Sequence, residues 1–376
     1  MTTTSPWIRG RGIGRLLAQE TNISDLLQFL SDRDSRPWRD LVGLVPEKVE
    51  REVLESNNSD LLLTAGDGEK VAIEVKLGHV LSADQQERYE GLPDGTRLVL
   101  AALSMDEQRL DLDSASRWSF LSLVRIFDAW TEVEDEAARA LASQAVLVLG
   151  AWDEQIAGVL RPPEEEGSLP LNVLTQKFLA RVVSRRIAMD LRNRRPETYA
   201  RISSGGGLPI VQSWQVIRGE NAGGYFMAEV RWGSKPGGEL RFGVNFAVPV
   251  GATESEELRR AAYELACNMD SHISFLALKE HLEDVDPRLA GLLERRKSSR
   301  LTAKGDWEQV VRHGFAGAAL QDGKENNRRR TRPAFYGDGA LRFQAMIHVD
   351  FGSACGQDIA DLLDATLTYL AERQPA

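Results

Sequence analysis

The chain has few of the residues that define several common protein classes. Its 376 residues include only two cysteines, Cys267 and Cys355. Two cysteines so far apart give neither a disulfide framework nor the paired spacing of a zinc site. No apolar run approaches the roughly 20 residues of a membrane span, and the N-terminus lacks the apolar segment of a signal peptide. We therefore expect a cytoplasmic protein with no membrane association.

The chain also has no overall excess of positive charge. It carries 46 basic and 56 acidic residues, for a formal net charge of -10. Non-specific coating of nucleic acid needs a basic surface, so any contact with nucleic acid must use local basic patches. The five histidines are scattered and define no triad or metal spacing, so we expect each of them to serve packing or the surface. They are His79, His272, His281, His313 and His348.

One early segment holds the most informative side chains. Apolar and polar residues alternate over residues 71–77, the period of a strand, so Glu74 and Lys76 project from the same face. The preceding strand, residues 60–64, is joined to it through a Gly-Asp-Gly turn. A three-residue loop there places Asp60 opposite Glu74, whereas a two-residue turn would shift the register and put Asp60 on the other face. We favour the longer loop.

Two opposed carboxylates predict a cation site. Directly opposed residues have Cβ atoms roughly 5 Å apart, so Asp60 and Glu74 could share one hard cation such as Mg²⁺ or Mn²⁺. Without a cation the two charges repel, and one carboxyl group must be protonated or solvated. Gln85 and Tyr89 follow one helical turn apart on a predicted helix.

This combination resembles the PD-(D/E)xK nuclease superfamily, whose fold is restriction-endonuclease-like, and in particular its branch with a Gln-x-x-x-Tyr motif. The resemblance covers roughly the first 130 residues. It implies that Asp60 and Glu74 bind the metal and that Lys76 positions or activates the attacking water. It also implies that Gln85 and Tyr89 lie on a helix that contacts the substrate strand. The proline that gives the superfamily its name is absent here, because a serine precedes Asp60.

Glu20 is a further candidate ligand. It lies on the apolar stripe of a predicted helix, and burying an unpaired carboxylate costs several kcal/mol, so a metal site would explain it. Superfamily members often add a glutamate from the first helix, and the Leu-Leu-rich helix here resembles the opening of one bacterial subfamily. In the alternative interpretation the helix begins at Asn22 as its N-cap and leaves Glu20 in an exposed turn.

The other motif residues also have structural alternatives. Short edge strands often carry Lys and Glu for solubility alone. Ser82 and Gln85 match a capping box, in which Gln85 reaches back to the helix start. Tyr89 alternatively serves as half-buried packing.

Basic residues concentrate in the second half of the chain. Residues 171–201 carry eight basic and two acidic residues, a net of +6. Phosphates are one candidate partner, and a solvated arginine face or a protein interface is the alternative. A second run, residues 324–332, has five basic residues and one acidic residue, although such runs are usually just solvated. The candidate substrate-binding arginines are Arg185, Arg186, Arg194 and Arg195.

Composition divides the chain into two domains. Residues 1–159 are predicted as an α/β domain of restriction-endonuclease-like fold, with a central mixed sheet flanked by helices. It includes a strand over residues 97–103 and helices over residues 119–130 and 134–149. Residues 160–170, with two prolines and an acidic triplet, are predicted as a linker.

Residues 171–376 are predicted as an α+β domain for recognition or oligomerisation. Its predicted strands span residues 210–218, 225–232, 240–248 and 341–351, and its predicted helices follow the basic helix over residues 254–282 and 357–371.

We therefore expect a metal-dependent nuclease acting on DNA, in bacterial defence or DNA processing, with Mg²⁺ or Mn²⁺ as cofactor. The expected catalytic residues are Glu20, Asp60, Glu74 and Lys76, of which the three carboxylates would be the metal ligands. The C-terminal domain would bind a target, a partner or a second copy of the chain as a homodimer. The competing hypothesis is a catalytically silent nucleic-acid-binding or assembly module on the same fold.

Overall fold

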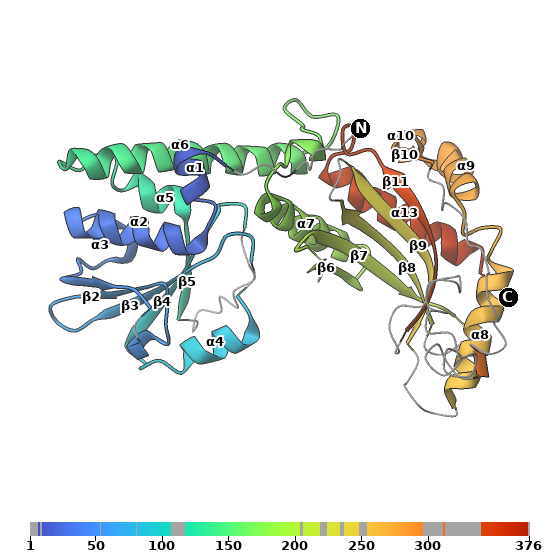
Figure 1. Ribbon diagram of the computed structural model, residues 1–376, viewed down its shortest axis with the longest axis horizontal. Coiled ribbons are helices and arrows are strands. Elements are labelled where there is room, and N and C mark those ends of the chain that lie inside the picture. The colour runs from blue at the N-terminus through green and yellow to red at the C-terminus, as the bar shows by residue number, and fades with distance from the viewer. Residues whose placement is uncertain are drawn as a thin grey trace, which may run out of the picture. The chain divides into compact units, whose positions relative to one another are not determined.

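Two compact units make up the chain in the computed structural model (Figure 1). The N-terminal unit comprises Trp7–Gly158 and Leu174–Val182, and the C-terminal unit contains Val159–Val173 and Val183–Ala376. The structure describes residues 7, 10–52, 54–79, 81–106, 117–203, 206–218, 224–233, 237–247, 254–295, 311–312 and 340–374. The basic run over residues 324–332 lies outside these described residues.

A mixed five-stranded sheet forms the centre of the N-terminal unit, as predicted. The strand order is β1-β2-β3-β4-β5, in which β1 to β3 pair antiparallel and β3 to β5 pair parallel. The strands are β1 (Lys48–Glu50), β2 (Leu61–Thr64), β3 (Lys70–Val75), β4 (Thr96–Ala102) and β5 (Trp118–Ser122).

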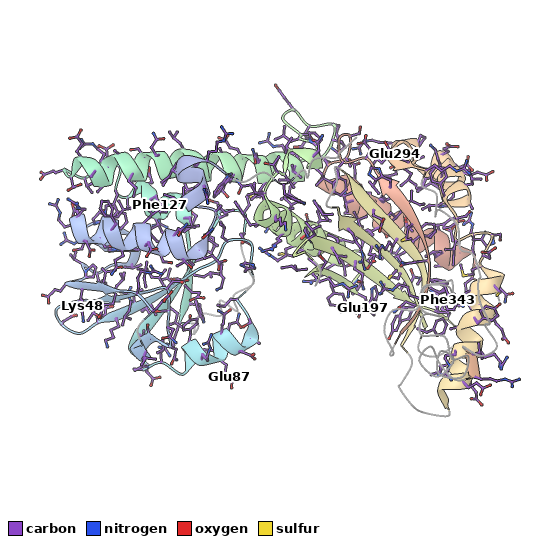
Figure 2. The ribbon with its side chains drawn as sticks, in the orientation of Figure 1. Lys48, Glu87, Phe127, Glu197, Glu294 and Phe343 are labelled. Atoms are coloured by element: carbon purple, nitrogen blue, oxygen red, sulfur yellow. The ribbon has the colours of Figure 1, made fainter. Side chains whose placement is uncertain are left out.

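Helices cover both faces of this sheet (Figure 1). Helices α2, α5 and α6 lie on one side, where the buried side chain of Phe127 is found, and α4 lies on the other (Figure 2). The α4 face holds an apolar cluster that includes Leu62, Ala72 and Tyr89. The helices are α1 (Gly12–Leu16), α2 (Glu20–Arg33), α3 (Trp38–Val42), the 3₁₀ turn η1 (Leu54–Ser56), α4 (Ala83–Glu90), α5 (Leu123–Asp128) and α6 (Glu136–Leu160).

The predicted helix over residues 119–130 was wrong at its start. Trp118–Ser122 pairs with β4 as the fifth strand, with Leu98 opposite Trp118. The side chain of Ser122 then accepts a hydrogen bond from the amide of Arg125 and caps α5. A serine at this position ends the strand and starts the helix, since its hydroxyl satisfies one free amide of the first turn.

An antiparallel six-stranded sheet forms the C-terminal unit. The strand order is β10-β11-β9-β8-β7-β6, and α13 packs on β7 and β8. The four predicted strands are present, whereas β6 and β10 were not predicted. The strands are β6 (Thr198–Ile202), β7 (Pro209–Val216), β8 (Gly224–Trp232), β9 (Gly238–Ala247), β10 (Leu293–Glu294) and β11 (Ala340–Val349).

The predicted long helix over residues 254–282 is two helices. The first helix ends at Asn268. Ser274 caps the second helix by accepting a hydrogen bond from the amide of Ala277. No described helix combines the length and the apolar character that crossing a bilayer requires. The C-terminal unit includes the 3₁₀ turn η2 (Leu171–Val173), α8 (Glu254–Asn268), α9 (Phe275–Val285), α10 (Pro287–Gly291) and α13 (Gly356–Glu372).

Helix α7 (Lys177–Arg192) begins in one unit and ends in the other. Its first residues belong to the N-terminal unit, where the ring of Phe178 packs edge-on against Trp152 with centroids 4.8 Å apart. The predicted linker, residues 160–170, is part of the compact C-terminal unit. Leu174–Val182, which follows this segment in the sequence, helps to build the N-terminal unit.

Candidate active site

The turn between β2 and β3 sets the register of the site. Leu61 pairs with Ile73 and Thr64 with Lys70, and the amide of Ala65 donates to the carbonyl of Glu69 at 2.9 Å. The loop thus contains three residues, Gly-Asp-Gly, as predicted. Its last glycine has a φ of +88°, which glycine adopts without steric cost. Asp60, the residue before β2, therefore lies on the face of the sheet that carries Glu74.

Asp60 contacts the strand that carries its expected partner. Its Oδ2 accepts a hydrogen bond of 2.7 Å from the amide of Val75. Burial raises the pKa of Asp60 to about 7, and the charge of Glu74 adds to the rise, while the Val75 hydrogen bond and the charge of Lys76 act in the opposite direction. The two carboxylates therefore repel, as expected for a pair without a cation.

Glu74 is the most heavily hydrogen-bonded residue of the site. Its side chain is buried, with Oε1 accepting from Lys76 Nζ at 2.5 Å and from Gln85 Nε2 at 3.2 Å. Oε2 accepts from the hydroxyl of Tyr89 at 2.5 Å. Lys76 is also buried, with 7% of its surface exposed. A buried charge needs such partners, and charge-assisted hydrogen bonds are the strongest available.

Helix α4 holds Glu74 in place through the two residues of the Gln-x-x-x-Tyr motif. Gln85 completes the predicted capping box with Ser82, and its side-chain amide also donates to Glu74, while its predicted contact with a substrate strand stays a prediction. Tyr89 is only 2% exposed and packs edge-on against Trp118. Burial raises its pKa above the ordinary value, and the hydrogen bond to Glu74 raises it further. Tyr89 thus orients Glu74 through its hydroxyl group, while its predicted contact with a substrate strand stays a prediction.

Glu20 belongs to the same neighbourhood. It is the first residue of α2, whose N-cap is Gln19, so the alternative start at Asn22 was wrong. Its Oε1 accepts from the amide of Leu77 at 2.6 Å and lies 3.0 Å from Nδ1 of His79. Burial acts to raise the pKa of Glu20, but these two hydrogen bonds and the charge of Lys76 outweigh it and lower the pKa.

The carboxylates fit a cation that keeps part of its own solvation. In the described part of the chain, no three His, Cys, Asp or Glu side chains are grouped closely enough to hold a metal ion. The predicted set of Glu20, Asp60 and Glu74 is therefore no closed cage. Mg²⁺ is usually bound through only one or two carboxylates, with water and substrate phosphates as further ligands. Asp60 and Glu74 have this oxygen chemistry, and Glu20 interacts electrostatically with Asp60.

His79 was not predicted as a site residue. It lies three residues after Lys76 in the loop that follows β3, and its Nε2 lies 2.6 Å from a guanidinium nitrogen of Arg181 on α7. A lone histidine has no sequence pattern that separates it from a surface residue. The only feature of the sequence that could have indicated a role in the site was its position, three residues after Lys76.

The four arginines predicted to bind substrate have different environments. Arg194 forms ion pairs with Asp361 at 2.8 Å and with Asp364 at 3.0 Å, both on α13. Arg195 donates to Asp364 at 2.5 Å and also to Gln215 and Thr368. These two residues bind α13, and their assignment as phosphate ligands stays a prediction. The other two, Arg185 and Arg186, lie partly buried on α7.

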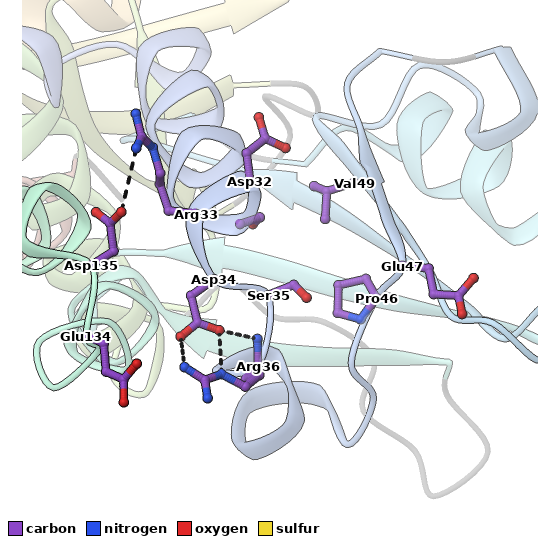
Figure 3. Close-up of a pocket in the computed structure, with 11 residues that line it drawn as sticks. Asp32, Arg33, Asp34, Ser35, Arg36, Pro46, Glu47, Val49, Glu134 and Asp135 are labelled. Carbon is purple, nitrogen blue, oxygen red and sulfur yellow. Dashed lines mark hydrogen bonds and ion pairs between the residues drawn. The ribbon is translucent and has the colours of Figure 1, made fainter.

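A separate hollow of about 710 Å³ lies beyond the C-terminal end of α2 (Figure 3). Its arginines are already paired: Arg36 binds Asp34 through two hydrogen bonds, and Arg33 lies 3.6 Å from Asp135. None of the predicted site residues lines it. We therefore do not assign it to the candidate active site.

No protein-family model, curated protein or solved structure matches this chain. The chemistry of the site is therefore inferred from its own geometry.

Asp60→Asn should stabilise the metal-free protein at high pH. Because the pKa of Asp60 is raised from 3.8 to about 7, the folded state retains a proton that the unfolded chain releases, so stability falls as the pH rises through this interval. Asparagine removes the repulsion with Glu74 and can still accept from Val75. In EDTA at pH 8 we expect the melting temperature to rise by at least about 3 °C, and by less at pH 5. Equal gains at both pH values, or a similar gain in the exposed control Asp94→Asn, would contradict the repulsion.

Arg195→Gln should destabilise the C-terminal unit. The guanidinium is only 18% exposed and its hydrogen bonds to α13 include a charge-assisted one, so we expect a loss of about 2–3 kcal/mol in unfolding free energy. Chemical denaturation is the measurement, with the exposed Arg218→Gln as control. Unchanged stability together with a flatter salt dependence of DNA binding would mean that Arg195 binds phosphate, as predicted, and does not stabilise the unit.

Proposed function

We propose that the N-terminal unit is a metal-dependent nuclease that hydrolyses phosphodiester bonds, with DNA as its substrate. The observation that carries the proposal is the facing pair of Asp60 and Glu74, with Lys76 bonded to Glu74 at 2.5 Å. Together with Gln85 and Tyr89, these residues match the motif of the PD-(D/E)xK superfamily branch that the sequence resembles, apart from its proline. We further propose a cytoplasmic role in bacterial defence or DNA processing.

Each residue of the site has a distinct task in this proposal. Asp60 and Glu74, with help from Glu20, would hold Mg²⁺ or Mn²⁺, which when bound would polarise the phosphate and lower the pKa of water. Gln85 and Tyr89 fix the orientation of Glu74 through its two oxygens. Lys76 forms an ion pair with Glu74 and, with a cation held beside Glu74, would orient the attacking water or stabilise the developing negative charge through its ammonium group.

Contacts with DNA must come from local basic groups, because the chain as a whole is acidic. Arg185 and Arg186 on α7 and Arg194 and Arg195, which also contact α13, are the predicted candidates for these contacts. Phosphate contacts of this kind fix the position of a strand without reading its sequence.

A catalytically silent module is the second candidate. It is favoured by the saturation of Glu74, whose two oxygens already accept three hydrogen bonds. The repulsion between Asp60 and Glu74 favours the nuclease instead. A structural domain gains nothing from two facing carboxylates that destabilise it, whereas such a pair is expected where function requires charge.

The test is an assay of the purified protein on linear, circular and single-stranded DNA and on RNA, with Mg²⁺, Mn²⁺ or EDTA. We expect cleavage of DNA that EDTA abolishes. Glu74→Gln and Lys76→Met should each reduce the rate at least about 100-fold with circular dichroism unchanged, because each removes a charge that acts in the transition state. Lys70→Met, at the opposite end of β3, is the matched control and should retain activity.

The outcomes separate the two candidates. Metal-dependent cleavage retained in both Glu74→Gln and Lys76→Met would move the active site elsewhere. Binding of DNA by the wild type without any cleavage would favour the silent module.

A further inference from the structure

The carboxylate of Glu20 is held by a chain of side chains that begins on α7. Arg181 contacts Nε2 of His79 at 2.6 Å, and Nδ1 of the same ring lies 3.0 Å from Oε1 of Glu20. The amide of Leu77 donates to the same oxygen at 2.6 Å. All four residues belong to the N-terminal unit, although Arg181 follows Glu20 by more than 150 positions.

The direction of these hydrogen bonds follows from their chemistry. A guanidinium group only donates, so Nε2 of His79 must accept from Arg181. Nδ1 of the neutral ring then carries the hydrogen and donates it to Glu20. Arg181 thereby selects the tautomer of His79 that can hold the carboxylate.

Helix α7 also supports the loop that carries His79. Gly78 has a φ of +72°, and a Cβ atom added there would lie 2.8 Å from Cβ of Phe178 and 2.7 Å from its carbonyl oxygen. The absence of a side chain at Gly78 is what allows α7 to approach so closely. Phe178 is buried in turn against Trp152. The loop, the helix and the histidine therefore form one packed unit.

We propose that His79 and Arg181 are positioning residues for Glu20, through which α7 completes the cation-binding side of the active site. The inference rests on the proposed nuclease function and extends it to a segment outside the predicted nuclease domain. Glu20 is about one quarter exposed, so without His79 it keeps only the hydrogen bond from Leu77 and can turn toward solvent. Residues that orient a metal-binding carboxylate typically change metal affinity about 10–100-fold when removed.

The test measures Mn²⁺ binding directly, by electron paramagnetic resonance of the free ion at one fixed pH. His79→Phe keeps the ring but loses both hydrogen bonds, and Arg181→Met removes the guanidinium. Each should raise the Kd for Mn²⁺ about 10-fold. His79→Asn, whose amide can donate from the position of Nδ1, should recover most of the affinity. Lys177→Met, an equal charge change on the exposed part of the same helix, should leave the Kd unchanged.

A double-mutant cycle distinguishes positioning from a general loss of structure. If His79 acts through Glu20, then His79→Phe should have almost no further effect on the Kd in a Glu20→Gln background. The rate of DNA cleavage at limiting Mn²⁺ should fall in the His79 and Arg181 variants, because the loss is in cation binding.

The experiments distinguish failure of the proposed nuclease function from failure of this inference. A wild type that binds no Mn²⁺ would overturn the proposed function and the inference with it. Wild-type binding with an unchanged Kd in His79→Phe and Arg181→Met, or fully additive effects in the cycle, would overturn the inference alone. If His79→Phe does not fold, as shown by circular dichroism, the Kd of Arg181→Met together with that of His79→Asn decides the question.

Discussion

The buried carboxylate of Glu74 is the constraint on which the N-terminal unit depends. An ionised carboxylate removed from water must be compensated by charge and hydrogen bonds, or it takes up a proton. Lys76, directly after β3, and Gln85 and Tyr89, both on α4, provide this compensation. The position of α4 over the sheet is thus tied to the chemistry of one side chain.

Asp60 acts against that compensation. It places a second carboxyl group beside Glu74, and burial together with the neighbouring charge raises its pKa to about 7. A site built for stability alone would carry a neutral or basic residue there. The unit therefore has a local electrostatic cost that a divalent cation would remove, and this is the physical reason for proposing that the pair binds a metal.

The sequence predicts the parts of the site that depend on local rules. Strand alternation puts Glu74 and Lys76 on one face, and the Gly-Asp-Gly loop sets the register that brings Asp60 to them. These local rules do not predict contacts between segments that are distant in the sequence. The sequence predicts a phosphate-binding cluster in the arginines after α7. It does not show that Asp361 and Asp364, far along the chain, lie beside them.

The same limit applies to His79 and to β5. A lone histidine acquires a role only when Arg181 and Glu20 are placed on either side of its ring, and nothing in the intervening sequence encodes that meeting. Residues 118–122 join the sheet because β4 offers a free parallel edge, which local helical periodicity does not reveal. Tertiary contacts therefore determine both the role of His79 and the strand conformation of residues 118–122.

The most direct test of the central claim is the location of Mn²⁺ in a crystal of the protein by its anomalous scattering. We predict one peak bonded to oxygens of both Asp60 and Glu74 at about 2 to 2.3 Å, with the ammonium of Lys76 displaced from Glu74. Absence of a peak at saturating Mn²⁺, with Lys76 still 2.5 Å from Glu74, would contradict it.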